Sequence, residues 1–233
     1  MILFYTPLIE TNPVLPPEEA AHALRVLRLV QGDALDLTDG RGNFYKALIA
    51  DTRGKQCRVE VTEKRAATPL WQGRLTIAVA PTKNMDRMEW FVEKAVEIGV
   101  DEIAFLNCRF SERRVIKTDR IEKIAVSAMK QSLKATLPQI EEMCDFDKFI
   151  ARPIAGAKYI AHCYEEEKQL LCDLLQTGEP ATLLIGPEGD FSPEEVEKAL
   201  AAGYRPVSLG GCRLRTETAA LVACHTYYLK NQL

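Results

Sequence analysis

The sequence has few of the residues that build metal sites. Among its 233 residues are three histidines and seven cysteines, and no Cys-x-x-Cys pair occurs. Zinc sites need clustered Cys and His ligands, so no metal site is expected. An odd number of scattered cysteines does not form a disulfide framework, and reduced thiols in a cytoplasmic protein are expected instead.

Long apolar runs and leader sequences are also missing. No apolar run approaches the roughly 20 residues that cross a membrane. The first ten residues, MILFYTPLIE, have no basic leader and no cleavage site, so no signal peptide is expected. Hydrophobic residues make up 47% of the chain, which is enough to build a real core in one large domain or in two smaller ones.

The net charge of -3 does not point to nucleic acid, but the charges are unevenly spread. Residues 108–134 contain eight basic and three acidic residues, whereas residues 164–200 contain ten acids and two lysines. Two solvated faces would explain this pattern. The alternative is a local anion-binding patch on a mildly acidic protein.

The first 65 residues predict a small β-barrel. The expected strands are residues 2–5, 34–38, 44–51 and 57–63. Asp39–Asn43 is a hairpin turn signal, and a short helix is expected over residues 17–27. Short strands of this kind close naturally into a barrel. Residues 64–73, with mixed charge and a proline, predict a linker.

From Leu75 onward, strands alternate with helices. The expected strands are residues 75–80, 102–107, 158–163, 182–186 and 206–210. The expected helices are residues 85–98, one from Asp119, one from Ser192 and one over residues 216–229. Gly99 is expected to end the first of these helices, and Ser192 with Glu195 is typical of a capping box. This alternation predicts a parallel sheet covered on both faces.

Two loops at predicted strand ends carry glycines, Gly186–Phe191 and Gly210–Thr216. Parallel α/β sheets bind ligands beyond the carboxyl ends of their strands, and glycine lets the backbone approach a ligand closely, although many glycines only form tight turns. No phosphate-binding loop, dinucleotide fingerprint or nucleophile elbow is present. Glu188 and Asp190 would repel phosphates. A neutral or cationic adenosine-like ligand such as S-adenosylmethionine is therefore expected.

Several stretches carry a resemblance that runs along nearly the whole chain. They are Leu184–Gly189 with Phe191–Ser192, Leu209–Gly210, Leu214–Ala219, His22–Arg28 and residues 83–103. Together they resemble the RsmE family of the SPOUT superfamily, whose members methylate N3 of a uridine in 16S ribosomal RNA. The sequence departs from the family pattern at Asp190, where glycine is common.

The resemblance implies an α/β fold with two domains. Residues 1–68 would form a PUA-like β-barrel that binds RNA, and residues 74–233 a SPOUT methyltransferase domain with a parallel sheet and a trefoil knot. It also implies S-adenosylmethionine as cofactor, S-adenosylhomocysteine as product, the small ribosomal subunit as partner, and a homodimer formed through the last helix.

The resemblance and the chemistry of uracil together indicate the site residues. The expected cofactor-binding residues are Leu184, Ile185, Gly186, Pro187, Glu188, Gly189, Leu209, Gly210, Leu214, Arg215, Thr216, Thr218 and Ala219. Uracil N3 carries a proton at neutral pH, so a cation that stabilises the anion or a base that removes the proton would help. Arg215 is the candidate cation and Glu188 the candidate base, with Glu217 as a further catalytic candidate. Each has a structural alternative: an Arg215 ion pair to Glu217 or Glu188, loop shaping by Glu188, and helix capping by Glu217.

Because N3 lies on the Watson–Crick edge, the target must be unpaired or flipped out. The candidate RNA-binding residues are His22, Arg25, Arg28, Lys83, Arg109, Arg113 and Arg114. Two other functions are weighed against methylation: a catalytically inactive RNA-binding or ribosome-assembly protein on the same fold, and an α/β enzyme acting on a small nucleotide.

Overall fold

The computed structural model describes residues 2–165 and 167–232. The chain divides into two compact units, residues 1–69 with 126–137 and residues 70–125 with 138–233. Residues 126–137, which lie inside the predicted range 74–233, therefore group with the first unit. Each unit is described by itself below.

The first unit is built on a four-stranded sheet in the order β1-β2-β3-β4. The strands are β1 (Leu3–Tyr5), β2 (Ala34–Thr38), β3 (Asn43–Asp51) and β4 (Arg58–Ala66), and a short 3-10 turn, η2, covers Arg53–Lys55. β1 pairs with β2 in parallel, and the other pairs are antiparallel. In the hairpin between β2 and β3, Asp39 Oδ1 accepts the backbone N–H groups of Arg41 at 2.8 Å and Asn43 at 3.2 Å. The predicted strands and hairpin are confirmed.

Two details of the first unit differ from expectation. β4 continues to Ala66, because residues 64–66 pair with Asn43–Tyr45, so the predicted linker begins later. The predicted helix over residues 17–27 is α1 (Pro17–Ala21) followed by a π-helix, η1 (His22–Val26). Arg28 then adopts a left-handed backbone with φ of +58°.

The second unit contains a seven-stranded sheet in the order β7-β6-β5-β10-β8-β11-β9. The strands are β5 (Leu75–Val79), β6 (Glu102–Asn107), β7 (Gln139–Asp145), β8 (Ala157–Ala161), β9 (Gln169–Leu170), β10 (Ala181–Ile185) and β11 (Arg205–Ser208). Every pairing is parallel, as the alternation of strands and helices predicted. All five residues of β10 are buried, which suits a strand between β5 and β8 with both faces covered.

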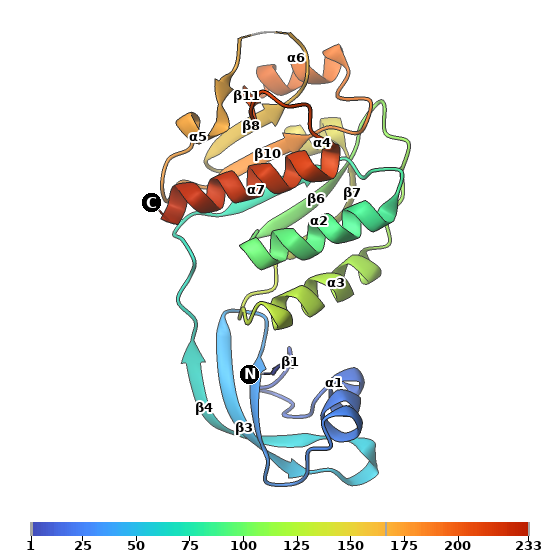
Figure 1. The fold of residues 1–233 in the computed structure, drawn as a ribbon, viewed down its shortest axis with the longest axis vertical. Helices are drawn as coiled ribbons and strands as arrows, with labels where there is room; N and C mark the ends of the chain where they lie inside the picture. The colour runs from blue at the N-terminus through green and yellow to red at the C-terminus, as the bar shows by residue number, and fades with distance from the viewer. Residues whose placement is uncertain (1, 166, 233) are drawn as a thin grey trace. The chain divides into compact units, whose positions relative to one another are not determined.

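Helices cover both faces of this sheet. The helices of the second unit are α2 (Met85–Ile98), α4 (Phe146–Ile150), α5 (Leu171–Leu174), α6 (Pro193–Ala201) and α7 (Thr216–Gln232), whereas α3 (Thr118–Gln131) begins in the second unit and ends in the first. Figure 1 shows α2 and α7 lying side by side across the sheet, where Cys224 Sγ of α7 lies 4.0 Å from the Ala95 carbonyl oxygen of α2. Residues of α4 and α6 pack against Ala78 and Leu184 in a separate core cluster on the other side. None of the helices within residues 2–165 and 167–232 is long and apolar enough to cross a membrane.

The sequence did not predict β7, α4, β9 or α5. β7 contains two adjacent glutamates and lies at the edge of the sheet, where an apolar run is not needed. The other three have only two to five residues each, so they carry no periodic signal. α7 also runs three residues beyond the predicted end, to Gln232.

Gly73 is fixed by close packing against α7. A Cβ at Gly73 would lie 2.1 Å from the hydroxyl of Tyr227 and 2.8 Å from the carbonyl oxygen of Glu179. The same hydroxyl donates a hydrogen bond of 2.8 Å to that carbonyl. Burial raises the pKa of Tyr227 to about 12, so the phenol keeps its donating proton at neutral pH.

Substitution of Gly73 by alanine should therefore destabilise the protein. The methyl group must displace a buried ring or a hydrogen-bonded carbonyl, and overpacking of this kind costs about 1–3 kcal/mol. Gly211→Ala is the matched control, because no atom lies within 4 Å of a Cβ built there. Urea unfolding measures both variants, and equal midpoints for Gly73→Ala and the native chain would contradict the packing argument.

Candidate active site

The loops after the central strands meet at one edge of the sheet. β6, β5, β10 and β8 are neighbours and run in parallel, so their carboxyl ends face the same side. The segment that follows β10, Gly186–Ser192, thus lies between the loops that follow β5 and β8. Both predicted glycine loops belong to this edge, since Thr216 Oγ1 donates a hydrogen bond of 3.1 Å to the Gly186 carbonyl oxygen.

The glycines of the two loops differ in how closely other atoms of the protein approach them. A Cβ at Gly186 would lie 3.1 Å from the Phe191 backbone nitrogen, and one at Gly189 would lie 3.2 Å from the Phe110 Cβ. These two are therefore explained by contacts within the protein. Gly210 and Gly211 have no atom within 4 Å of such a Cβ, and Gly210 has a φ of +121°. The second loop therefore has open space beside its backbone at these two glycines.

Acidic side chains tie the β10 loop to its neighbours. Glu188 Oε1 accepts the backbone N–H of Lys83, in the loop after β5, at 2.8 Å. Asp190 Oδ2 accepts the backbone N–H of Cys163, after β8, at 2.7 Å. The loop-shaping alternative for Glu188 thus has a direct counterpart in the structure.

Glu195 makes a third tie of the same kind. Its Oε2 accepts the Ser192 backbone N–H at 2.8 Å, and Ser192 Oγ accepts the Glu195 N–H, which forms the predicted capping box of α6. Its other oxygen, Oε1, accepts the backbone N–H of Arg109 at 2.8 Å. The helix cap therefore also holds the loop after β6.

Asp190 has an unusual backbone for a residue with a side chain. Its φ is +67°, in the left-handed region that glycine favours. Besides the bond to Cys163, its Oδ1 accepts the Phe191 backbone N–H at 2.8 Å. The two bonds of the carboxylate offset the backbone strain, which explains how an aspartate stands where glycine is common.

A carboxylate oxygen lies buried without a partner at the start of α7. Glu217 is 6% exposed, and among the residues that the structure describes its Oε2 has no hydrogen-bond partner. Its Oε1 lies 3.9 Å from Arg87 Nη1, which is an ion pair without a close hydrogen bond. A buried acceptor of this kind is costly unless a bound molecule supplies a donor.

Arg215 is exposed, and its side chain makes no ion pair or hydrogen bond with the described residues. The suggested ion pair to Glu217 or Glu188 is therefore absent from this part of the chain. The guanidinium is free to meet a bound molecule.

The remaining predicted cofactor residues divide by burial. Leu184, Ile185 and Pro187 have buried side chains, so only their backbone could face a ligand. The Ile185 carbonyl oxygen already accepts the Ala80 N–H at 2.9 Å. The partly buried members are Leu209, Leu214, Thr218 and Ala219.

Basic side chains of the second unit lie around the same loops. Arg113 is used internally, because its Nη2 donates to the Lys83 carbonyl oxygen at 2.7 Å and its Nε to that of Thr82 at 3.3 Å. Lys83 pairs with Glu112 at 2.9 Å, which raises the pKa of the lysine. Arg109 and Arg114 are exposed. Their side chains face solvent more freely than that of Arg113.

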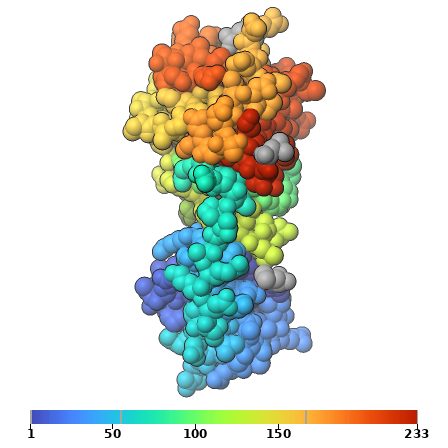
Figure 2. Space-filling view, turned by 90° about the vertical axis from the view of Figure 1, so that its left-hand side faces the viewer, coloured from blue at the N-terminus to red at the C-terminus, as the bar shows by residue number. Residues whose placement is uncertain are grey.

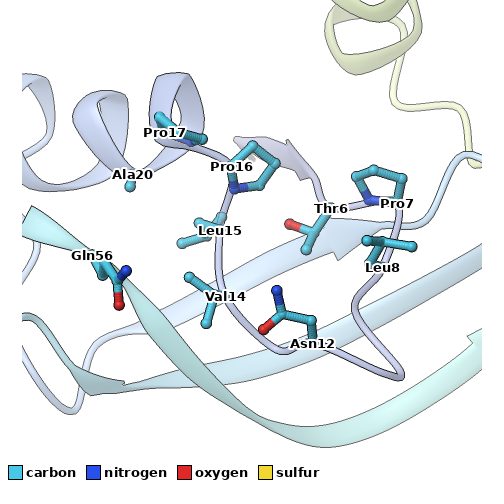
Figure 3. Close-up of a pocket in the computed structure, with 10 residues that line it drawn as sticks. All are labelled: Thr6, Pro7, Leu8, Asn12, Val14, Leu15, Pro16, Pro17, Ala20 and Gln56. Carbon is cyan, nitrogen blue, oxygen red and sulfur yellow. The ribbon is translucent and has the colours of Figure 1, made fainter.

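The first unit holds the other RNA-binding candidates. The His22 ring is partly buried, with its centroid 5.7 Å from that of Phe4, whereas Arg25 and Arg28 are exposed. Figure 3 shows a cavity of about 350 Å³ in the same unit. Its lining residues are Thr6, Pro7, Leu8, Asn12, Val14, Leu15, Pro16, Pro17, Ala20 and Gln56. None of them is charged, so the cavity offers no cation to a phosphate.

Two thiols near the loops at this edge have raised pKa values. Burial raises the pKa of Cys108, and burial followed by the charge of Asp190 raises that of Cys163. Neither is a ready thiolate nucleophile. Among residues 2–165 and 167–232, no three or more His, Cys, Asp or Glu side chains are grouped so that they could hold a metal ion.

Comparison with known proteins identifies the family. Residues 69–227 match the RNA methyltransferase domain family, and residues 15–62 match the RNA methyltransferase PUA domain family. The ribosomal RNA small subunit methyltransferase E (RsmE) of Rickettsia conorii is 30% identical over 85% of this chain and 81% of its own length. The chain belongs to the RsmE family of RNA methyltransferases. The resemblance seen in the sequence motifs is confirmed.

Solved structures of RsmE-like proteins share the whole fold. A probable rRNA-methyltransferase from Porphyromonas gingivalis is 50% identical, with a TM-score of 0.95 over 100% of this chain and 99% of that one. The RsmE of Neisseria gonorrhoeae, solved bound to S-adenosyl methionine, is 26% identical, with a TM-score of 0.86 over 99% and 98% of the two chains. The predicted fold class, a parallel-sheet methyltransferase domain of SPOUT type preceded by a small PUA-like β domain, is confirmed.

Some residues that connect the loops at this edge of the sheet were not predicted from the sequence. Glu195 was expected only as a helix cap, and Cys163 and Phe110 were not singled out at all. The three act through contacts between loops that follow different strands. No local pattern signals such contacts, whereas the order of the parallel strands could have suggested which loops are neighbours.

Asp190→Ala should destabilise the protein by about 1–3 kcal/mol, because the left-handed backbone remains while two hydrogen bonds are lost. Asp190→Asn should cost less, since asparagine tolerates this backbone and keeps one acceptor oxygen. Urea unfolding tests the order. An alanine variant as stable as the native chain would mean that the carboxylate does not hold the loop.

Proposed function

We propose that this chain transfers a methyl group from S-adenosylmethionine to N3 of a uridine in 16S ribosomal RNA of the small subunit, in the cytoplasm. The observation that carries the proposal is the joining of the two RsmE motif loops by the Thr216–Gly186 hydrogen bond at the carboxyl ends of the parallel strands. That edge is where sheets of this kind bind ligands. The relative from Neisseria gonorrhoeae was solved with this cofactor bound.

The residues present suit S-adenosylmethionine. Gly210 and Gly211 leave space beside the backbone, which allows a close approach of an adenosine-like molecule. The buried Glu217 Oε2 lacks a donor among the described residues and suits a ligand that carries N–H or O–H groups. When bound, the cofactor supplies the electrophilic methyl group on its sulfonium.

The chain itself has to prepare the nucleophile. Methyl transfer needs alignment of the two reacting atoms and the exclusion of water. Arg215, exposed and unpaired with the described residues, is suited to meet a uracil carbonyl oxygen and stabilise the anion that forms when N3 loses its proton. Glu217 Oε2 is a candidate to accept a hydrogen bond or the proton. Glu188 is less suited, because its Oε1 already holds the Lys83 backbone.

The RNA would be held mainly through its phosphates. Arg109, Arg114 and Lys83 are exposed around the site loops, and Arg25 and Arg28 are exposed in the first unit. Their cations suit phosphate contacts, which position a substrate without reading its sequence. His22 and Arg113 are each partly buried, so we assign them a smaller part in binding the RNA.

The experiment that tests the function uses small ribosomal subunits from cells that lack this gene. Incubation with the purified protein, S-adenosylmethionine and a chelator should produce one 3-methyluridine in 16S RNA, located by mass spectrometry of RNA fragments. A subunit that stays unmethylated, or methylation of another atom, refutes the proposal. Activity only after addition of a divalent metal ion would refute its metal-free form.

We further propose that the chain is threaded as a trefoil knot and forms a homodimer through α7. Figure 2 shows the last turns of α7 (red) at the surface, and Leu229 there is 45% exposed. A partner helix would cover this leucine. Light scattering at micromolar concentration should give twice 26.1 kDa, and an active monomer would exclude the dimer. A crystal structure that traces the segment 186–216 tests the knot.

Arg215→Ala should lower the methylation rate on the order of a hundredfold, as for removal of one electrostatic donor, while cofactor affinity stays within a few-fold. Raising the pH should restore part of the rate, because more uracil is then already deprotonated. Arg213→Ala, which removes an exposed arginine from the same loop, is the control and should keep most of the activity. Single-turnover rates and titration calorimetry measure the two quantities. A loss of cofactor binding in Arg215→Ala would instead mark the residue as a structural part of the loop.

A further inference from the structure

An aromatic ring stands exposed beside the active-site loop. Phe110 is 46% exposed, and a Cβ at Gly189 would lie only 3.2 Å from its Cβ and 3.8 Å from its Cγ. The Cβ of Phe110 therefore lies close to Gly189 in the loop after β10, and the side chain is partly exposed to solvent. No ring partner of Phe110 occurs among residues 2–165 and 167–232.

Two hydrogen bonds between Cys108 and Ser111 fix the turn that carries Phe110. The Cys108 N–H donates to Ser111 Oγ at 3.0 Å, and the Ser111 N–H donates to the Cys108 carbonyl oxygen at 3.1 Å. Both residues are buried, while the two central positions of the turn, Arg109 and Phe110, are exposed. The Arg109 N–H is fixed in addition by Glu195. The hydrogen bonds of residues 108–111 thus fix a turn whose two central side chains, Arg109 and Phe110, are exposed to solvent.

Two arginines lie in or against the turn that carries this ring. Arg109 Nη1 forms an ion pair with Glu194 Oε2 at 3.8 Å while its side chain stays 64% exposed, and Arg114 Nη2 donates to the Arg109 carbonyl oxygen at 3.5 Å. An exposed aromatic ring beside exposed arginines is the combination that binds unpaired bases, because the base stacks on the ring while the cations hold the phosphates.

We propose that Phe110 is a positioning residue on which an unpaired base of the RNA substrate stacks, next to the loop Gly186–Ser192. The inference rests on the proposed function, because it assigns part of the substrate-binding surface of that reaction. A uridine whose N3 is to be methylated lies outside any helix, so the energy lost when it unstacks must be recovered on the protein. Phe110 supplies a flat apolar surface for this purpose at the edge of the cofactor loop.

The test separates stacking from simple packing. Leucine at position 110 keeps apolar contact with Gly189 but has no planar face, whereas tryptophan and tyrosine keep one. Base stacking contributes about a tenfold effect or more per base. Phe110→Leu and Phe110→Ala should therefore raise the KM for small subunits about tenfold or more, with kcat and S-adenosylmethionine affinity changed by less than about threefold. Phe110→Trp and Phe110→Tyr should stay close to the native chain.

Val115→Ala is the matched control. Val115 is 72% exposed in the same basic loop and offers no ring, so its loss should leave the KM unchanged. Phe110→Leu with the native KM would overturn the proposal and make the ring a packing element. Equal losses of RNA and cofactor affinity would also overturn it, since they indicate a disturbed loop. A native chain that neither binds S-adenosylmethionine nor methylates subunits would refute the proposed function itself, a result distinct from either of these.

Discussion

Three carboxylates in the segment 186–195 hold the active-site edge together. Each accepts a backbone N–H from a loop that follows a different strand: Glu188 from the loop after β5, Asp190 from the loop after β8, and Glu195 from the loop after β6. A carboxylate is a strong acceptor and binds such donors better than a neutral group does. Glu188 and Asp190, which would repel a phosphate, therefore hold backbone groups in place. Gly186 and Gly189 beside them leave room for Phe191 and Phe110.

The groups suited to meet a ligand lie in or next to the other loop. Gly210 and Gly211 are open, Arg215 is exposed, and Glu217 keeps a buried oxygen without a partner among the described residues. The loop after β10 is thus fixed by hydrogen bonds, and residues 210–217 carry the groups that could touch a ligand. Thr216 joins them through its hydrogen bond to Gly186. A substitution in the loop after β10 is expected to change the stability of the protein first, and a substitution in residues 210–217 to change rate or affinity.

Much of this could be predicted from the sequence, because the relevant signals are local. The capping box at Ser192, the glycine that ends α2 and the hairpin at Asp39 each depend on a few adjacent residues, and all three are present. The parallel sheet followed from the alternation of strands and helices. The π-helix after α1 has no such signal, because its i to i−5 pattern differs from an α-helix by one residue only. Roles such as that of Glu195 depend on contacts across 86 residues of chain, which no short pattern contains.

The ties between loops have one more property: they end on main-chain N–H groups. The side chains of Lys83, Arg109 and Cys163 take no part in the bonds that fix their own backbones. Proline is the residue that these three positions exclude outright, because it has no N–H to donate. The backbone of these loops can therefore keep its position while the side chains that point outward from it change.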